Sequence, residues 1–378
     1  MIYLDNAATT PVRPEAVQAA LEAMTEGWAN PSSLYPAGKA AARRREEDRA
    51  QVAEALGCRP GEVYFISCGT EGDNWAVRSA LACNRRKGRH IVTTALEHAA
   101  VREPIRALER EGWEVTWLRP EADGGIRPEA VREAVRPDTV LVSMMLVNNE
   151  LGTVLPVREA REAIVRAGAP ALLHTDAVQG FLKLPFTPRE LGVDLLTVSG
   201  HKVGAPKGVG AQYVREGLKL PPLMLGGGQE KGLRPGTEAT AQTAAFAAAC
   251  RLGRAEMEEH ITHMKGLKEY ARQALAAGVP EVRELVRGQA PHILSLTLPG
   301  YKSEVLVRVL GDMGICVSAG SACHRGAPSH VFAALPLTKG ERDGAFRVSF
   351  SPATSRADVD ALVQGLAKAK DMLFPSMS

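Results

Sequence analysis

The stretch from residue 195 to residue 214 reads LLTVSGHKVGAPKGVGAQYV and contains Ser199-Gly200-His201-Lys202. Its apolar, β-branched start predicts a buried strand over 195–198, and 209–214 predicts a second strand. The glycines and prolines between them indicate turns, so Lys202 is expected where a strand ends and a loop begins. Catalytic groups in open α/β sheets commonly lie at such strand ends. A lysine held there, away from bulk water, can form a Schiff base, whereas the alternative is an ordinary surface lysine.

Strand patterns alternate with helical patterns before this stretch. Strands are expected over 63–67, 90–94, 114–118, 140–147 and 171–175, and helices over 71–82, 98–111, 128–135 and 156–167. This βαβα order predicts an α/β fold with a mainly parallel sheet between helices. A long helical stretch over 240–277 precedes a region of mixed strands and helices. Because 378 residues exceed the usual size of one core, two domains are expected. We expect a large domain over 15–249 and a small α+β domain formed by 1–14 and 250–378.

The composition is that of an ordinary globular protein, with 45% hydrophobic and 24% charged residues. A net charge of +3 is too small to indicate a nucleic-acid partner, and the basic cluster 43–45 precedes an acidic one, which predicts a solvated helix face. No apolar run is long enough to span a membrane, and the first residues do not resemble a secretory signal. The six cysteines are not spaced as CxxC, so no metal site is predicted, and free thiols in the cytoplasm are expected.

Two strand-to-helix turns carry polar groups that could act on a ligand. The segment 68–73, CGTEGD, predicts Thr70 as a helix N-cap with Asp73 completing a capping box. The free N–H groups of such a turn also suit a phosphate, so a plain cap and an anion site are both open. His98 lies at the next such turn, where it could be structural or could move protons beside an aromatic ring.

Further polar groups follow strands or lie in loops. Asn149 ends a strongly apolar strand, where it could cap a turn or donate to a carboxylate or phenolic oxygen. Asp176 ends the next strand, where a carboxylate needs a cation or a donor, and a pyridinium nitrogen would serve. The Gly-rich loop 226–237 is either a turn or a source of donors to a phosphate. Arg347, within an apolar strand, needs an anion, which is either a structural acid or a substrate carboxylate.

The segment 318–326, SAGSACHRG, presents Cys323 among small residues and beside a histidine and an arginine. Nearby positive charge raises the thiolate fraction of a cysteine. A reactive thiol and a buried hydrophobic residue are therefore both open for Cys323. The other cysteines are expected to be buried hydrophobic residues: Cys58, Cys68, Cys83, Cys250 and Cys316.

Taken in order, these segments resemble the cysteine desulfurases, which belong to the class V aminotransferase group of pyridoxal-phosphate enzymes. The matching segments cover nearly the whole chain: YLDNAATTP, NPSS, GTEGDN, EHAAV, VNNELG, HTDAVQ, SGHK, PKGVGA, GGGQE, RPGTE, SAGSAC and FRVSF. Their joint order and spacing carry the resemblance. It implies the fold-type-I architecture, with a mainly parallel seven-stranded sheet, helices on both faces and a smaller α+β domain.

The resemblance also implies a role for each matching residue. Lys202 would hold pyridoxal 5'-phosphate as a Schiff base, Asp176 would pair with the ring nitrogen, and Gln179 would hydrogen-bond the phenolic oxygen. His98 would stack on the ring and shuttle protons. Asn149, also expected in the cofactor site, and Arg347 would bind the substrate carboxylate. The phosphate would be held by Gly69, Thr70, Ser199 and His201, together with Thr237 of the partner subunit.

The implied enzyme is a homodimeric, cytoplasmic cysteine desulfurase. Cys323 would take the sulfur of L-cysteine as a persulfide, release alanine and pass the sulfur to an acceptor protein. Iron–sulfur cluster assembly, tRNA thiolation, DNA modification and cofactor synthesis are all open as destinations. Selenocysteine lyase is an alternative on the same scaffold, and a non-catalytic sulfur-carrier protein is an alternative of another class. The segment after Cys323 is shorter than in relatives that serve a scaffold, which bears on the acceptor.

Overall fold

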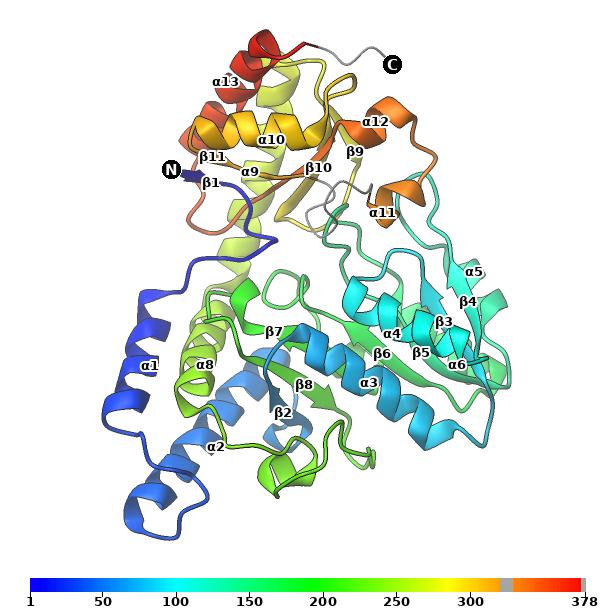
Figure 1. Ribbon diagram of the computed structural model, residues 1–378, viewed down its shortest axis with the longest axis vertical. Helices are drawn as coiled ribbons and strands as arrows, with labels where there is room; N and C mark the ends of the chain where they lie inside the picture. The colour runs from blue at the N-terminus through cyan, green and yellow to red at the C-terminus, as the bar shows by residue number, and fades with distance from the viewer. Residues whose placement is uncertain (320–328, 375–378) are drawn as a thin grey trace.

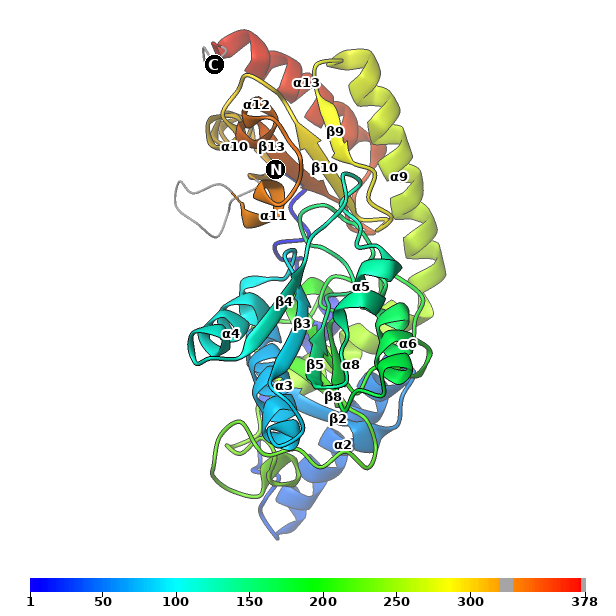
Figure 2. The ribbon, with the colours of Figure 1, turned by 90° about the vertical axis from the view of Figure 1, so that its right-hand side faces the viewer.

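The computed structural model describes residues 1–319 and 329–374. Figure 1 shows a lower part built on a large sheet and an upper part in which the chain begins and the last helix, α13 (Arg356–Met372), lies. Helix α9 (Met257–Gly278) runs between the two parts, as the turned view in Figure 2 also shows. The N-terminal segment also passes from the upper part to the lower part.

Within the described residues, the large sheet has seven strands in the order β2-β8-β7-β6-β5-β3-β4. Their bounds are β2 Val63–Ile66, β3 His90–Thr94, β4 Glu114–Leu118, β5 Thr139–Ser143, β6 Leu172–Asp176, β7 Leu195–Ser199 and β8 Gly210–Val214. Strand β8 is antiparallel to both neighbours, and the remaining pairs are parallel. The carboxyl ends of the other strands therefore meet along one edge, which is where ligands bind in open α/β sheets.

Helices cover both faces of this sheet (Figure 2). They are α1 Pro14–Thr25, α2 Pro36–Leu56, α3 Gly69–Asn84, α4 Ala99–Arg110, α5 Pro128–Ala134, α6 Val157–Ala167, α7 Pro188–Leu191 and α8 Thr240–Ala255, with 3-10 turns at Pro60–Glu62, Gly200–Lys202 and Gln229–Gly232. Local sequence sets their ends. Helix α2 begins with Pro36 in its first turn, and Gly57 ends it at a φ of 70°, a left-handed conformation that glycine adopts without strain.

In the upper part, the described residues form a four-stranded sheet of order β12-β13-β10-β9 and a separate parallel pair, β1 with β11. The strands are β1 Ile2–Tyr3, β9 Arg283–Val286, β10 Ile293–Thr297, β11 Ile315–Cys316, β12 Ser318–Ala319 and β13 Ala345–Ser349. The remaining helices are α10 Ser303–Asp312, α11 His330–Ala333 and α12 Lys339–Asp343. Pairing of β1 with β11 favours a small domain that includes the N-terminal segment together with the C-terminal region. The predicted boundary at 249 falls inside α8 and stays a prediction.

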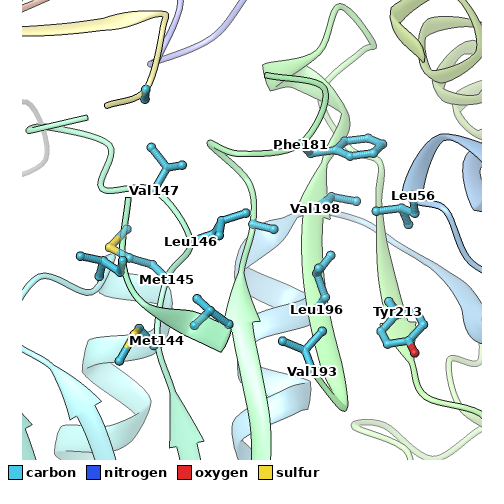
Figure 3. Packing of buried hydrophobic residues seen from close by; sticks show 14 of the residues in the cluster. Leu56, Met144, Met145, Leu146, Val147, Phe181, Val193, Leu196, Val198 and Tyr213 are labelled. Atoms are coloured by element: carbon cyan, nitrogen blue, oxygen red, sulfur yellow. The ribbon is translucent and has the colours of Figure 1, made fainter. Parts of the chain in front are cut away.

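The two parts have separate hydrophobic cores. The larger core lies against the large sheet, and Figure 3 shows part of it, with Leu196 and Val198 of β7 near Leu56 and Phe181. The upper core includes Phe346 and other side chains of the four-stranded sheet. Burying one aliphatic or aromatic side chain contributes roughly 1.5–3 kcal/mol. These cores therefore hold the strand ends, and the polar residues that follow them, in fixed positions.

The predicted α/β fold with its mainly parallel seven-stranded sheet is confirmed, and three local predictions are wrong. The helical stretch over 240–277 is two helices, because Glu256 leaves helical geometry with a ψ of 2°. Strand β5 ends at Ser143, although the N–H groups of Met144 and Leu146 still bond to carbonyls of β6. The basic cluster 43–45 is not a fully solvated face, because Arg45 is only 8% exposed and pairs with acids from another loop.

Candidate active site

A cavity of ≈340 Å³ lies at the carboxyl edge of the large sheet. Most of the predicted site residues line it: Gly69, Thr70, His98, Asn149, Asp176, Gln179, Ser199, His201, Lys202 and Arg347. They come from the last residues of β6 and β7, from the connections that follow β5, β6 and β7, from the starts of α3 and α4, and from β13 of the upper part. Segments that are far apart in the chain thus meet in one cavity between the two parts.

Lys202 reaches the cavity from the short turn after β7. Its Nζ donates hydrogen bonds to the main-chain oxygens of Ala7 and Ala8, each at 2.7 Å. The amine of Lys183 donates to the main-chain oxygen of Lys202 at 2.9 Å. Burial, with the charge of Lys202 as a second cause, lowers the pKa of Lys183 to about 7. The chain therefore holds the Lys202 turn from two sides, from the N-terminal segment and from a buried amine.

Asp176, the last residue of β6, lies in a buried acidic corner of the cavity. Its Oδ1 accepts from the N–H of Val178 at 2.9 Å. Burial first, and the neighbouring Asp73 second, raise the pKa of Asp176 to about 7. Asp73 is 1% exposed, also lines the cavity, and has its pKa raised to about 7 by burial. A cation placed against Asp176 would favour its ionised form, so this corner suits a protonated ring nitrogen.

His98 caps α4, and its Nδ1 accepts from the N–H of Ala100 at 3.2 Å. Burial lowers the pKa of His98, and the helix N-terminus also disfavours a cationic ring. With Nδ1 accepting, the neutral ring carries its proton on Nε2. A second imidazole, His330, lines the cavity and places its Nε2 3.0 Å from the main-chain oxygen of Glu97. Both rings can take part in proton movement at the cavity wall.

The start of α3 differs from its prediction. The N-cap residue is Cys68 rather than Thr70, and Glu71 instead of Asp73 reaches back, accepting from the N–H of Ser67 at 2.9 Å. The capping box at Thr70 is therefore wrong, because the carboxylate of Glu71 satisfies the preceding turn and lets the helix begin earlier.

This turn fits a phosphate by its shape and its donors. A Cβ on Gly69 would lie 3.1 Å from Cγ2 of Val178 and 3.9 Å from Cβ of Ser199, so glycine lets the backbone come close to both. The first N–H groups of α3 have no partners within the helix. His201 lies nearby on the cavity wall, with its Nδ1 3.2 Å from Oγ1 of Thr9. A helix N-terminus with such side-chain donors is suited to an anion.

Arg347 enters the cavity from β13. Its Nη1 donates to the main-chain oxygen of Asn149, and its Nη2 pairs with Oδ1 of Asp5, each at 2.7 Å. The sequence left open whether Arg347 pairs with a structural acid or with a substrate carboxylate, and the structure shows that Asp5 is such an acid. A guanidinium has five N–H groups, so these two bonds leave donors for a carboxylate in the cavity.

Gln179 lies across the cavity. Its Nε2 donates to the main-chain oxygen of Ala7 at 2.8 Å, and its Oε1 lies 3.2 Å from Nε2 of His292. An amide nitrogen has two hydrogens, so one of them remains for a group in the cavity.

Two other predicted site residues, Thr237 and Cys323, are not among the described residues that line this cavity. Thr237 is exposed and is absent from the described lining. Cys323 lies outside the described residues. Of the remaining cysteines only Cys250 is buried, as predicted. The prediction is wrong for the others, which lie at element ends and are partly exposed: Cys58, Cys68, Cys83 and Cys316.

Sequence reasoning missed several residues of the cavity wall. Asp73 was predicted only as part of a cap, and Glu150 and His330 were given no role, although all three line the cavity. Burial raises the pKa of Glu150 to about 7. For Glu150, its position directly after the predicted site residue Asn149 was the one feature of the sequence that could have indicated a place in the cavity wall. The main-chain oxygens of Ala7 and Ala8 carry no side-chain signal at all.

Comparisons with known proteins identify the family of this chain. A family model, aminotransferase class V, matches residues 2–362. The cysteine desulfurase IscS of Methanosarcina thermophila is 38% identical, over 96% of this chain and 90% of that protein. A solved structure described as a NifS-like protein has a TM-score of 0.93 at 32% identity, covering 98% of this chain and 100% of the other. SspA, solved in complex with cysteine, has a TM-score of 0.79 at 30% identity, covering 94% and 100%. This chain belongs to the cysteine desulfurases of the class V aminotransferase family.

Cysteine desulfurases depend on pyridoxal 5'-phosphate, and the cavity fits that group. Lys202 offers an amine, Asp176 a buried carboxylate and the start of α3 a set of phosphate donors. The family, the fold and the cofactor expected for a cysteine desulfurase are thus confirmed. Among the described helices, none is long and apolar enough to cross a bilayer.

Proposed function

We propose that this cysteine desulfurase takes the sulfur of L-cysteine onto Cys323 as a persulfide, releases L-alanine, and delivers the sulfur to an acceptor protein in the cytoplasm. The observation that carries the proposal is one cavity that joins an amine, a buried carboxylate and a guanidinium, on Lys202, Asp176 and Arg347. The amine would attach the cofactor, the carboxylate would hold the proton of its ring nitrogen, and the guanidinium would bind the substrate carboxylate.

The cofactor, when bound, supplies an electron sink for bonds next to the substrate's α-carbon. The chain's own residues position groups and move protons. Gln179 can donate its second N–H toward a phenolic oxygen, and Asn149 can donate beside Arg347 to the substrate. His98, neutral and protonated on Nε2, can give and take a proton at the cavity wall, as can the amine of Lys202.

The phosphate would lie against Gly69, Thr70, Ser199 and His201. The described cavity already brings these residues together without Thr237. We assign Thr237 to the phosphate of the other subunit, because it is exposed on a loop outside its own cavity.

The sulfur step conserves atoms. The Cys323 thiolate bonds to the substrate's sulfur, the carbon–sulfur bond breaks, and that carbon gains a proton to become the methyl group of alanine. The enzyme thiol and L-cysteine thus become an enzyme persulfide and L-alanine. An acceptor thiol can then take the outer sulfur by exchange.

A homodimer is supported by large apolar side chains left uncovered on one chain. Trp28, Leu34 and Leu225 are 70%, 85% and 92% exposed. The first two lie in the connection between α1 and α2, and Leu225 lies in the loop that leads to Thr237. In the proposed dimer, the second copy covers these side chains and receives Thr237 at its own phosphate site.

The deciding experiment is a single turnover of L-cysteine without reductant, followed by mass spectrometry of the peptides. Wild-type protein should carry one extra sulfur on the peptide that contains Cys323. Cys323→Ser should keep the yellow cofactor and make no persulfide, while Cys316→Ser, the matched control, should behave as wild type. Extra sulfur on Cys68 or Cys316, or a normal rate in Cys323→Ser, would contradict the proposal. Parallel turnover of selenocysteine tests the alternative lyase.

A further inference from the structure

The loop that carries Thr237, residues 226–238, is attached to the large sheet by a buried ionic cluster. Glu230 lies in it with a left-handed φ of 48°, and its carboxylate is 2% exposed. Arg49 Nη1 donates to this carboxylate at 2.7 Å, and the N–H of Phe65 donates at 2.9 Å. Arg45 pairs with the same group. The first half of the loop is thereby fixed against α2 and β2.

The second half of the loop has a separate ionic contact. Arg234 Nε donates to Oε1 of Glu71 at 2.8 Å, and its Nη2 donates to Oε2 at 3.2 Å. Both side chains are largely buried, at 24% and 12% exposure. This fork geometry fixes direction as well as distance, unlike a single point charge.

Glu71 also belongs to the turn that forms the phosphate site. It follows Thr70 in the first turn of α3 and accepts from both the N–H and the hydroxyl of Ser67. Although burial by itself raises its pKa, the hydrogen bonds from Arg234 and Ser67 hold the pKa of Glu71 below its usual value. The carboxylate is therefore charged at neutral pH and has partners on both sides.

We propose that the Glu71–Arg234 ion pair is a positioning contact that serves two cofactor sites of the dimer at once. Within its own subunit it fixes the first turn of α3, which holds a phosphate. Through the loop it fixes Thr237, three residues after Arg234, which is offered to the other subunit. The inference rests on the proposed function, which assigns Thr237 to the partner's phosphate.

The first test measures how tightly the cofactor-free dimer binds pyridoxal phosphate and how tightly it binds pyridoxal, which lacks the phosphate. Glu71→Gln and Arg234→Gln should each weaken pyridoxal phosphate by about tenfold, as expected for loss of a hydrogen bond to a charged group. Pyridoxal binding should be unchanged, and Arg234→Lys should restore part of the loss. The matched control is Arg272→Gln, which breaks the 2.8 Å pair of Arg272 with Glu284 at similar exposure. It should leave both affinities as in wild type.

Mixed dimers with one wild-type subunit provide the second test. Thr237→Ala should weaken one of the two sites. Arg234→Gln should weaken both, because Arg234 fixes the first turn of α3 in its own subunit and also positions Thr237 for the partner's site. Only one weakened site with Arg234→Gln, or equal losses for pyridoxal and its phosphate, would overturn the inference. Failure of the proposed function would look different. Either wild-type protein would bind no pyridoxal phosphate, or Thr237→Ala would leave cofactor binding unchanged.

Discussion

The amine of Lys202 donates a 2.7 Å hydrogen bond to the main-chain oxygen of Ala7, 195 positions earlier in the chain. Ala7 also accepts from Gln179 at 2.8 Å, so one main-chain oxygen orients two groups of the cavity. The N-terminal segment is therefore part of the active-site wall. Its placement depends on β1 pairing with β11 and on the contact of Asn6 with Ser349 on β13.

Replacing Lys202 by alanine should abolish covalent attachment of the cofactor. Activity should fall by at least about 10²-fold, the usual contribution of a positioned acid–base group. Borohydride treatment of wild-type protein should fix the cofactor to the peptide containing Lys202. Lys207→Ala, an exposed lysine in the same connection, is the control and should keep attachment and rate. A label on any other lysine would refute the assignment.

Asp176→Asn removes a carboxylate and keeps its shape. We expect turnover to fall by about 10- to 100-fold, because a hydrogen bond to a charged group contributes about 1.5–3 kcal/mol. Cofactor affinity should fall as well, measured by titration of the cofactor-free protein. Asp123→Asn, in an exposed turn, serves as the control. Full activity in Asp176→Asn would mean that Asp176 only caps its turn.

Thr237→Ala should weaken cofactor binding without unfolding the protein, because Thr237 is exposed within one chain. The expected loss is about tenfold for a hydrogen bond to a charged phosphate. Thr237→Ser, which keeps the hydroxyl, should recover most of it. Sedimentation should find a dimer. A monomer that retains both cofactor and activity would disprove the shared site.

Lys183→Met should change how stability depends on pH. Unfolded lysine binds its proton up to about pH 10.4, whereas the folded amine of Lys183 has its pKa lowered to about 7. Between these values the unfolded state binds more protons, so this group makes wild-type stability rise with pH. The rise is about 1.4 kcal/mol per pH unit.

Urea unfolding from pH 7 to pH 10 measures this dependence. The slope of the free energy of unfolding against pH should be smaller in Lys183→Met than in wild type. Lys207→Met, at an exposed position, should leave the slope unchanged. Equal slopes in all three proteins would show that Lys183 keeps an ordinary pKa when folded.

The sequence by itself determined the architecture and most of the cavity. Alternation of buried strands with helices is a local pattern, and it placed Lys202 and Asp176 at strand ends because polar residues follow apolar runs directly. Parallel strands bring those ends to one edge, so the meeting of these residues could be predicted from order alone. The roles assigned to them came from the joint order of the motifs.

Only the tertiary structure decided which distant groups meet. Arg45 reads as part of a solvated face because its sequence neighbours are charged, yet Glu230 reaches it from a loop 185 positions away and burial follows. Asp5 with Arg347 and Glu71 with Arg234 are likewise ion pairs between distant segments that only the fold brings together. Helical and strand periodicities describe which face of an element is apolar, whereas partners across the fold depend on how those faces pack. That packing is a property of the whole chain, and no local pattern contains it.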